Sequence, residues 1–374
     1  MSKKIKVLHM TPPQIKNGIY KYIFNNMKYF DFDKFQFDFL TQNKEELMKT
    51  EEYRKYHFGI RSFTTTQRDN REKFKQEIYD ILSDGYDVIH LHTSSWRGFL
   101  IEEIAMELGI PKVIVHSHST GVDFKNEEER KAVRETHEKF KAEFGKQHAT
   151  HFCACSMEAA KWLYNDSINE KDIIILNNGI DSERFSFNKI KRDELRKKYD
   201  LEDKIVVGNV GRFCFQKNPL FLIDSFAKAK NKNSKLFLVM IGEGDLKEEI
   251  EKLIEEKKME SDVLLLDWQE NIQDYLQMFD VFCIPSNFEG LPITVIEAQA
   301  AGLRCLVSDT ITGECKITDL VDFLPLESLV WCNAINQCSN AYMRKNMSDI
   351  IKEKGFDSRI EAKKLEDIYL DIRR

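Results

Sequence analysis

Glycine and proline are scarce in this sequence, with 16 and 7 residues among 374. Long flexible linkers therefore have little to be built from, and we expect most of the chain to be folded. The eight cysteines include no Cys-x-x-Cys pair. They follow no obvious disulfide framework, which favours reduced thiols in the cytosol.

Long apolar runs are missing as well. No window approaches 18 consecutive apolar residues, so the sequence predicts no membrane-spanning helix. Lys6 and His9 interrupt the apolar stretch near the start, which is typical of a first strand and not of a secretion signal. We therefore expect a cytoplasmic protein, and peripheral contact with the cytoplasmic face of a membrane stays open.

An excess of charge of one sign is missing too. The chain has 56 Lys and Arg against 62 Asp and Glu, a formal net charge of -6. Such a balance offers no global attraction to nucleic acid, so no nucleic-acid partner is expected. A local basic face for an anionic membrane is not excluded, because a net charge does not show how the charges are distributed.

What the sequence does contain is a regular alternation of short apolar runs with longer amphipathic stretches. The first series of expected strands is Ile5–Met10, Phe35–Leu40, Asp87–Leu91, Lys112–His116, His151–Ala154 and Ile173–Leu176. The second series is Lys204–Val210, Leu236–Ile241, Val263–Leu266, Val281–Ile284 and Arg304–Val307. Apolar strands that alternate with helices indicate parallel sheets covered on both faces. The sequence thus predicts an α/β chain with two Rossmann-like, doubly wound domains that face a cleft.

The domain boundaries are expected in polar stretches. An Asn-Gly turn at residues 178–179 precedes a polar segment, so the first domain should cover residues 1–185 and the second 186–356. Residues 357–374 carry apolar side chains at near-helical spacing. We expect this last segment to form a closing helix that returns to the N-terminal domain.

The strongest local signal is the run from Pro285 to Gly302. Its pattern predicts that a strand ends, that a loop follows, and that a helix starts near Pro292, since proline is favoured in a first helical turn. The free amides of Gly290 and Leu291 would then lie at the positive end of this helix, which suits a phosphate group.

Two glutamates of this run are candidate ligand contacts. Glu297, inside the expected helix, can accept hydrogen bonds from ribose hydroxyls, and Glu289, in the loop before it, from sugar hydroxyls. The alternative is an ordinary helix with an acidic N-terminal region and one solvated glutamate.

The spacing of Glu289 and Glu297 within Ser-Asn-Phe-Glu-Gly-Leu-Pro resembles the donor-site signature of glycosyltransferase family 4. This is a family of retaining enzymes with the two-domain GT-B fold. Further similar segments follow the family order, namely Asn178-Gly-Ile-Asp181, Val210-Gly-Arg-Phe-Cys-Phe-Gln-Lys-Asn218 and Ile241-Gly-Glu-Gly244. The resemblance covers nearly the whole chain and is strongest to capsule and exopolysaccharide members.

The resemblance implies a role for the loop after Val210. Arg212 and Lys217, beside Gly211, would bind the diphosphate and neutralise it as it leaves, since fixed cations stabilise developing negative charge. A loop arginine and lysine taken alone are more often solvated surface. With these cations in place of a metal ion, we expect a metal-independent enzyme without a cofactor, to which the nucleotide sugar is a substrate.

Histidines occur in pairs at two expected strand ends, His90 with His92 and His116 with His118. Residues two apart on a strand point the same way, so the four imidazoles are able to converge. They are either cleft-lining, structural or zinc ligands, but no cysteine or carboxylate is spaced to complete a zinc site. The resemblance implies that His118 is the acceptor-domain histidine that approaches the donor sugar.

Two weaker patterns complete the candidates. Gly18 stands where the family often has Gly-Gly, and a glycine that opens a helix either lets an acceptor approach the backbone or simply starts the helix. Asp31-Phe-Asp33 matches the Asp-x-Asp metal motif of a different glycosyltransferase fold. Its position between a helix and a strand indicates a polar turn instead.

The expected function is transfer of a hexosyl group from a nucleotide-diphosphate sugar, UDP by family frequency, to a saccharide or lipid-linked saccharide hydroxyl in capsule or exopolysaccharide synthesis. The alternatives are a non-catalytic GT-B subunit that binds sugar nucleotides, and a sugar-nucleotide epimerase or a phosphorylase on a similar scaffold. A dinucleotide-dependent oxidoreductase is disfavoured, because the first strand-helix turn lacks Gly-x-Gly-x-x-Gly.

Overall fold

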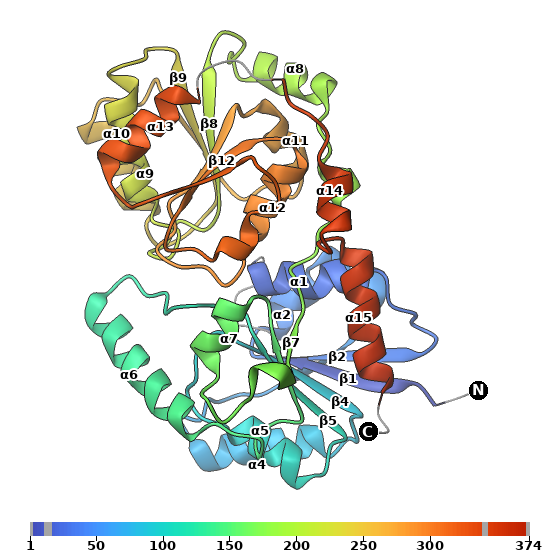
Figure 1. Ribbon diagram of the computed structural model, residues 1–374. Helices are drawn as coiled ribbons and strands as arrows, with labels where there is room; N and C mark the ends of the chain where they lie inside the picture. The colour runs from blue at the N-terminus through green and yellow to red at the C-terminus, as the bar shows by residue number, and fades with distance from the viewer. Residues whose placement is uncertain (1–2, 11–16, 339–342, 372–374) are drawn as a thin grey trace. The chain divides into compact units, whose positions relative to one another are not determined.

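The computed structural model describes residues 3–10, 17–338 and 343–371. The chain divides into two compact units, each with its own parallel sheet (Figure 1). The first unit contains residues 1–121, 131–179 and 358–374, and the second contains residues 122–130 and 180–357.

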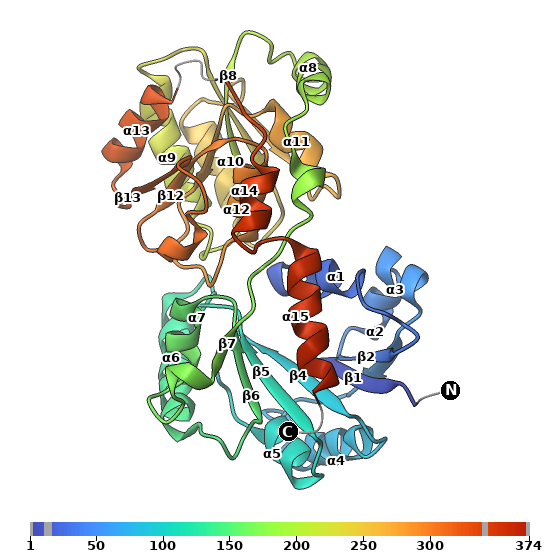
Figure 2. The same ribbon diagram turned by 45° about the vertical axis from the view of Figure 1, so that its right-hand side comes forward.

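The first unit has a seven-stranded sheet in the order β3-β2-β1-β4-β5-β6-β7. Its strands are β1 (Ile5–Met10), β2 (Phe35–Thr41), β3 (Gly59–Ser62), β4 (Val88–Thr93), β5 (Lys112–Ser117), β6 (His151–Ala154) and β7 (Ile173–Ile175). Its helices are α1 (Gly18–Met27), α2 (Lys44–Met48), α3 (Glu51–Tyr56), α4 (Arg71–Leu82), α5 (Leu100–Glu107), α6 (Glu127–Glu143, which begins in the residues counted with the second unit), α7 (Met157–Leu163) and α15 (Ser358–Leu370). In both ribbon views α15 lies beside α1 against this sheet (Figures 1 and 2).

The second unit has a six-stranded sheet in the order β10-β9-β8-β11-β12-β13. Its strands are β8 (Ile205–Val210), β9 (Leu236–Ile241), β10 (Val263–Leu266), β11 (Val281–Ile284), β12 (Arg304–Ser308) and β13 (Val321–Leu324). Its helices are α8 (Lys189–Lys198), α9 (Pro219–Lys230), α10 (Lys247–Glu256), α11 (Ile272–Met278), α12 (Ile293–Ala300), α13 (Ser328–Gln337) and α14 (Ser348–Glu353). Short 3₁₀ turns occur in both units, at Glu170–Asp172, Ser182–Phe185 and Gly313–Cys315.

The two cores differ in composition. In the first unit, Phe24, Phe39 and Phe58 pack together, with ring centroids 5.4 Å apart for Phe24–Phe39 and 4.4 Å apart for Phe39–Phe58. In the second unit the core is mainly aliphatic, and Leu238 and Val281 are fully buried on central strands. Each such side chain contributes roughly 1.5–3 kcal/mol when it leaves water. Strands this apolar require cover on both faces, which the flanking helices give.

The prediction of two Rossmann-like parallel-sheet domains is confirmed. All eleven expected strands are present, and their ends differ from the expected ones by no more than two residues. Two edge strands, β3 and β13, were not predicted, because each is short and contains polar residues, Arg61 and Ser62 in β3 and Asp322 in β13. The expected polar turn at Asp31 is present, with the Asp33 amide donating to the Asp31 carboxylate at 2.9 Å.

The unit boundaries lie at residues 179–180 and 357–358. In addition, residues 122–130, expected in the N-terminal domain, are grouped with the second unit. The expected closing helix corresponds to α15, and residues 372–374 of that expectation lie outside the described residues.

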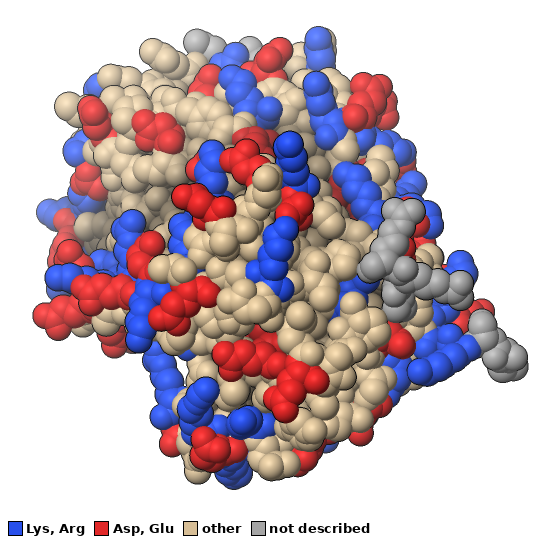
Figure 3. All heavy atoms as spheres, turned by 60° about the horizontal axis from the view of Figure 1, so that its bottom comes forward, with Lys and Arg blue, Asp and Glu red and all other residues tan. Residues whose placement is uncertain are grey.

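Surface charge and helix length bear on the membrane question. Acidic and basic side chains are interspersed over the face shown in Figure 3. Over the described ranges, none of the helices has both the length and the apolar character that a bilayer crossing requires.

Candidate functional site

Glu289 lies in the loop between β11 and α12, with 6% of its surface exposed. Its Oε1 accepts hydrogen bonds from Lys217 Nζ at 2.5 Å and from Ser286 Oγ at 2.8 Å. Its Oε2 accepts from Gln216 Nε2 at 3.1 Å. Lys217 and Gln216 belong to the loop between β8 and α9, so loops that follow two neighbouring central strands meet here. This carboxyl edge of a parallel sheet is where such folds bind ligands.

Arg212 joins the same cluster. Its guanidinium pairs with Asp123 Oδ2 at 2.8 Å and donates to Gln216 Oε1 at 2.9 Å. The backbone amide of Gln216 donates to Asp123 Oδ1 at 2.9 Å. We call Asp123, Arg212, Gln216, Lys217, Ser286 and Glu289 the donor-loop cluster. Its two cations and two carboxylates are half-buried or buried, so charge on an incoming ligand would be weakly screened.

The segment that supplies Asp123 is anchored to the second unit at two further points. Lys125 forms an ion pair with Glu249, and the guanidinium of Arg130 lies 3.6 Å from the ring centroid of Phe215. Cation–π contacts of this kind stabilise a position by about 0.5–1 kcal/mol. Asp123 is therefore held at the β8–α9 loop by its neighbours as well as by its own pairing.

A glycine turn that follows β9 packs against the β8–α9 loop and holds it in place. Phe213 and Glu243 are joined by a backbone hydrogen bond of 2.8 Å, and Leu246 donates to Phe213 at 2.9 Å. A Cβ atom on Gly242 would stand 1.9 Å from the carbonyl oxygen of Gly211. The Gly-x-Gly turn therefore allows the backbone of Gly242 to contact the backbone of Gly211, the residue before Arg212.

Glu297 lies in the second turn of α12 and is 3% exposed. The helix begins at Ile293, with Pro292 as its N-cap, one residue later than the expected first helical turn at proline. Gly290 and Leu291 lie in the loop just before it and are both buried. The structure therefore keeps the predicted order of loop glutamate, glycine, helix N-terminus and helical glutamate.

Arg212, Lys217 and Glu289 are brought into one cluster as the sequence suggested, and Gly211 lies beside them. Asp123, Gln216 and Ser286 were missed. Gln216 and Ser286 lie inside the quoted motifs, one residue from Lys217 and three from Glu289, so they were within reach of the sequence. Asp123 is 93 residues away from Gln216 and belongs to no motif.

The predicted histidines converge in the first unit. His90 and His92 lie on β4, His116 lies on β5 and His118 follows it directly. A fifth imidazole, His9 on β1, joins them and stacks on His92 with centroids 5.3 Å apart. His9 was missed as a site residue, although its strand position in register with His90 carries the signal.

The imidazoles are linked by ring-nitrogen hydrogen bonds. His118 Nε2 lies 2.9 Å from His92 Nδ1, and His92 Nε2 lies 3.0 Å from His9 Nδ1. His90 Nε2 lies 3.1 Å from His116 Nδ1. Burial lowers the pKa of His118 and of His9 to about 3 and places the pKa values of the other three well below the ordinary value. The cluster is therefore neutral at physiological pH.

Two groups of three imidazoles in the described residues have ligand atoms within 4.8 Å of one another, namely His9 with His90 and His92, and His92 with His116 and His118. Neutral imidazole is a suitable ligand for zinc and similar metals. The expectation that this protein uses no metal thus stays a prediction.

Within the part of the chain that the structure describes, no hydrogen bond links Gly18 to either cluster. This glycine is the first residue of α1, whose N-cap Asn17 accepts from the Tyr20 amide at 2.8 Å. A Cβ atom at Gly18 would meet no atom of the described residues within 4 Å, so none of these residues requires glycine here. Its acceptor role stays a prediction.

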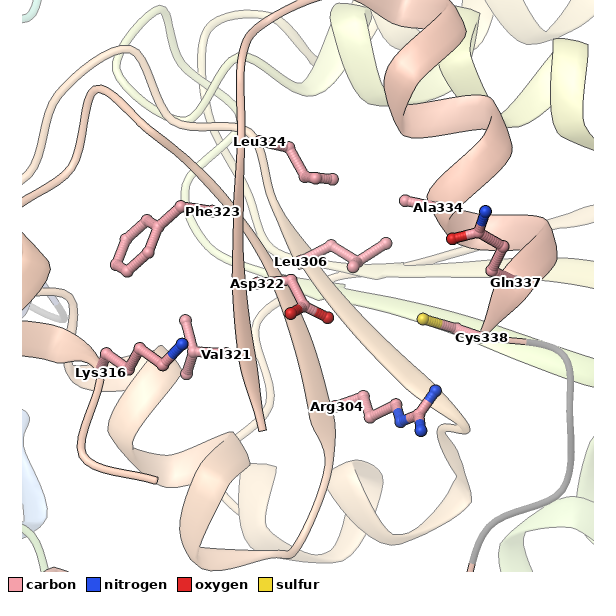
Figure 4. A pocket seen from close by; sticks show the side chains of 10 residues that line it. All are labelled: Arg304, Leu306, Lys316, Val321, Asp322, Phe323, Leu324, Ala334, Gln337 and Cys338. Atoms are coloured by element: carbon pink, nitrogen blue, oxygen red, sulfur yellow. The ribbon is translucent and has the colours of Figure 1, made fainter. Parts of the chain in front are cut away.

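A separate cavity of about 520 Å³ opens between β12, β13 and α13 (Figure 4). Its lining residues are Arg304, Leu306, Lys316, Val321, Asp322, Phe323, Leu324, Ala334, Gln337 and Cys338. None of the candidate site residues predicted from the sequence lines it.

Comparison with known proteins bears on this arrangement. Residues 191–319 match the family described as glycosyl transferases group 1, and residues 16–184 match glycosyltransferase family 4. A Bacillus subtilis protein assigned as glycosyltransferase EpsF is 30% identical over 98% of this chain and 97% of its own length. An Escherichia coli UDP-Gal:α-D-GlcNAc-diphosphoundecaprenol α-1,3-galactosyltransferase is 28% identical over 79% of this chain and 78% of its own.

Solved structures support the fold. Anabaena HepE in complex with UDP and glucose has a TM-score of 0.76 at 16% identity, over 97% of this chain and 99% of its own. A glycosyltransferase from Rickettsia africae has a TM-score of 0.74 at 16% identity, over 99% and 98%. Because the Bacillus subtilis relative matches almost end to end and the two family models together match most of the chain, the chain belongs to glycosyltransferase family 4 and is a transferase of the GT-B fold.

Proposed function

We propose that this enzyme transfers a hexosyl group, with retention of configuration, from a UDP-sugar to a lipid-linked saccharide in capsule or exopolysaccharide synthesis. The observation that carries the proposal is the donor-loop cluster, in which Arg212, Lys217 and Glu289 meet at the carboxyl edge of the second sheet. Support for the nucleotide and acceptor comes from relatives, one named for UDP-galactose and a diphosphoundecaprenol acceptor and another solved with UDP and glucose.

The chemistry follows from the charges. The bond between the anomeric carbon and the diphosphate oxygen breaks, and the bond to the acceptor hydroxyl forms on the same face. The acceptor proton passes to an oxygen of the leaving diphosphate. Arg212 and Lys217 stabilise the negative charge that grows on this group, and they are already oriented by their present partners, which limits reorganisation.

The remaining candidates have separate roles in the proposal. Amides of Gly290 and Leu291 bind phosphate near the start of α12, and Glu297 holds the ribose hydroxyls. Glu289 exchanges its Lys217 partner for hydroxyls of the sugar. His118 belongs to the first unit and contacts the donor sugar, with His90, His92, His116 and Gly18 on the acceptor side. Because the cations serve the diphosphate, no metal ion is required.

The purified chain should be incubated with a panel of nucleotide sugars and an undecaprenyl-diphosphate saccharide, with and without EDTA. We expect turnover with a UDP-sugar that EDTA does not reduce, and an NMR coupling constant that shows an α-linked product from an α-linked donor. Loss of turnover with EDTA that Mn²⁺ restores contradicts metal independence. Donor binding without transfer favours a partner-subunit function, and epimerised donor favours an epimerase.

A further inference from the structure

The histidine cluster continues beyond the imidazoles into the C-terminal helix. Tyr369 of α15 is fully buried, and its hydroxyl lies 2.6 Å from His90 Nδ1 and 3.4 Å from His9 Nε2. The hydrogen bonds therefore form one unbranched path through His118, His92, His9, Tyr369, His90 and His116, which we call the histidine chain. Its members come from β1, β4, the end of β5 and α15, all within the first unit.

Such a path permits two arrangements of protons. A neutral imidazole has one N–H donor and one lone-pair acceptor, so each link fixes the next ring's tautomer. If one ring adopts its other tautomer, every other ring along the path has to change its tautomer as well. Otherwise two donors or two acceptors face each other across a contact of about 3 Å. The tautomer of His118 is thus tied to the hydroxyl of Tyr369, which lies three hydrogen bonds away along the path.

The tyrosine decides between the two arrangements. A phenol is a stronger donor than an imidazole N–H, and 2.6 Å is short for a hydroxyl contact. Tyr369 therefore donates to His90 Nδ1 and accepts from His9 Nε2–H at the longer distance of 3.4 Å. His90 then donates from Nε2 to His116, whose own Nε2–H finds no hydrogen-bond partner among the described residues. The perpendicular ring of Tyr22, 4.9 Å away, offers at most a weak acceptor there.

In the other half of the histidine chain, from Tyr369 to His118, the hydrogen bond that Tyr369 accepts fixes the tautomer of each ring in turn. His9 accepts at Nδ1 from His92 Nε2–H, and His92 accepts at Nδ1 from His118 Nε2–H. His118 is the most exposed member of the histidine chain, and this arrangement leaves its Nδ1 as a lone pair. An Nδ1 lone pair accepts a hydrogen bond from a sugar hydroxyl, whereas an Nδ1–H would repel its proton.

We infer that Tyr369, His9 and His92 are positioning residues that hold His118 as the Nε2–H tautomer and so present an acceptor nitrogen to the sugar. The functional half of this inference rests on the proposed role of His118. The tautomer itself does not, because it is a property of the free protein.

The three-histidine groups also admit a metal ion, but the geometry favours the proton chain. The ring nitrogens that would bind the ion are already paired with one another in hydrogen bonds of 2.9–3.1 Å. In the tetrahedral geometry of zinc, with bonds of about 2.0–2.1 Å, two ligand nitrogens stand roughly 3.3 Å apart without a proton between them. Bound metal is therefore an outcome of the test and not a part of the inference.

The test uses full-length protein labelled with ¹⁵N-histidine, whose ring-nitrogen shifts report each tautomer directly. In the wild type we expect His118 to show a protonated Nε2 and an unprotonated Nδ1 throughout the neutral pH range. Tyr369→Phe keeps the ring and removes the hydroxyl, so His118 should shift to a mixture of both tautomers. Tyr22→Phe is the matched control, because its ring touches the same imidazoles but the chain does not pass through its hydroxyl, and it should leave the shifts of His118 unchanged.

Two further measurements keep the inference falsifiable. If Tyr369→Phe does not fold, His9→Gln interrupts the same path from β1 and should have the same effect on His118. In kinetics, Tyr369→Phe should lower kcat about tenfold or more and leave KM for the nucleotide sugar within twofold. An Nδ1-protonated His118 in the wild type, identical His118 shifts in Tyr369→Phe, or one equivalent of metal in the purified protein would each overturn the inference. If the chain proves to have no transferase activity, the ring shifts still decide the tautomer.

Discussion

Individual residues of the donor-loop cluster already neutralise one another in the free protein. Lys217 is paired with Glu289, and Arg212 with Asp123. A diphosphate that binds here must either displace these carboxylates from the two cations or share the cations with them. The carboxylates therefore determine how strongly the cations attract the diphosphate. Asp123 has a particular place in this competition, because it faces Arg212 and lies outside every recognised motif.

Asp123→Asn is expected to strengthen binding of the bare nucleotide. The amide keeps the acceptor for the Gln216 amide but removes a negative charge beside Arg212. The pair is partly exposed, which limits its strength to roughly 1 kcal/mol, or about fivefold in affinity. Calorimetric titration with UDP measures this, with the exposed Asp166→Asn as control. A loss of affinity would show that Asp123 orients Arg212 for the nucleotide instead.

His118→Ala is expected to separate catalysis from nucleotide binding. His118 belongs to the first unit, whereas Arg212 and Glu297 belong to the second. Turnover should therefore fall at least tenfold, by about the 1.4 kcal/mol that a tenfold change requires, while the affinity for UDP stays within twofold. Steady-state kinetics and calorimetry on the same preparation check both quantities. Equal losses in both would assign His118 a structural or nucleotide role.

At the scale of elements, the loops depend on close backbone contacts. Gly242→Ala is expected to lower the melting temperature, because its Cβ would lie 1.9 Å from the Gly211 carbonyl oxygen and backbone has to move. Overpacking of this kind costs about 1–3 kcal/mol, and the nucleotide affinity should fall as Gly211 shifts. Gly18→Ala is the control, since open space and a helical position predict unchanged or slightly raised stability. A tolerated Gly242→Ala would contradict the bracing of the β8–α9 loop by this turn.

Helix α5 carries a second element-scale feature, a buried carboxyl. Burial raises the pKa of Glu102 from 4.5 to about 7. The folded protein then holds this proton more tightly than the unfolded chain does, so the contribution to stability is complete below pH 4.5 and is lost as the pH rises to about 7. The span corresponds to about 3 kcal/mol at most.

Glu102→Gln removes this titration and should flatten the fall of stability between pH 5 and pH 8. Chemical denaturation of wild type and variant at several pH values measures the difference. Glu107→Gln, at an exposed position of the same helix, should keep the wild-type slope. Parallel curves for wild type and Glu102→Gln would mean that the carboxyl is not protonated in the folded protein.

At the scale of the whole molecule, local patterns predicted the architecture well. Long apolar strands such as Leu236–Ile241 can be recognised from the sequence, because a parallel strand that helices cover on both faces has to be apolar throughout. The short strands Gly59–Ser62 and Val321–Leu324 could not be recognised in this way, because polar residues interrupt both and neither is buried along its whole length. The grouping of residues 122–130 with the second unit also lacks any local signal.

The same limit applies to the clusters. The Glu289–Glu297 motif was visible because one loop and one helix carry it. The pairing of Asp123 with Arg212, and of Tyr369 with His90 across 279 positions, arises from the fold alone. Contacts whose residues belong to no recognised motif, as in these two pairs, were therefore found in the structure and not in the sequence.

The central claim, a nucleotide-sugar donor site on the second unit, is tested most directly by comparing Glu289→Gln with Glu297→Gln. Glu297 should hold ribose, which does not change during transfer, so its loss should raise the donor KM and weaken UDP binding. Glu289 should contact the transferred sugar, so its loss should lower kcat while UDP affinity stays within a few-fold. A charge-assisted hydrogen bond of about 1.5–3 kcal/mol corresponds to roughly 10- to 150-fold in rate.

The measurement combines calorimetry with UDP and steady-state kinetics with the accepted UDP-sugar on wild type and both variants. The account predicts that Glu289→Gln changes kcat and that Glu297→Gln changes KM and UDP affinity. Loss of UDP binding in Glu289→Gln with a change in kcat alone in Glu297→Gln would show that the roles are reversed. Wild-type values in both variants would show that the donor does not bind at this site.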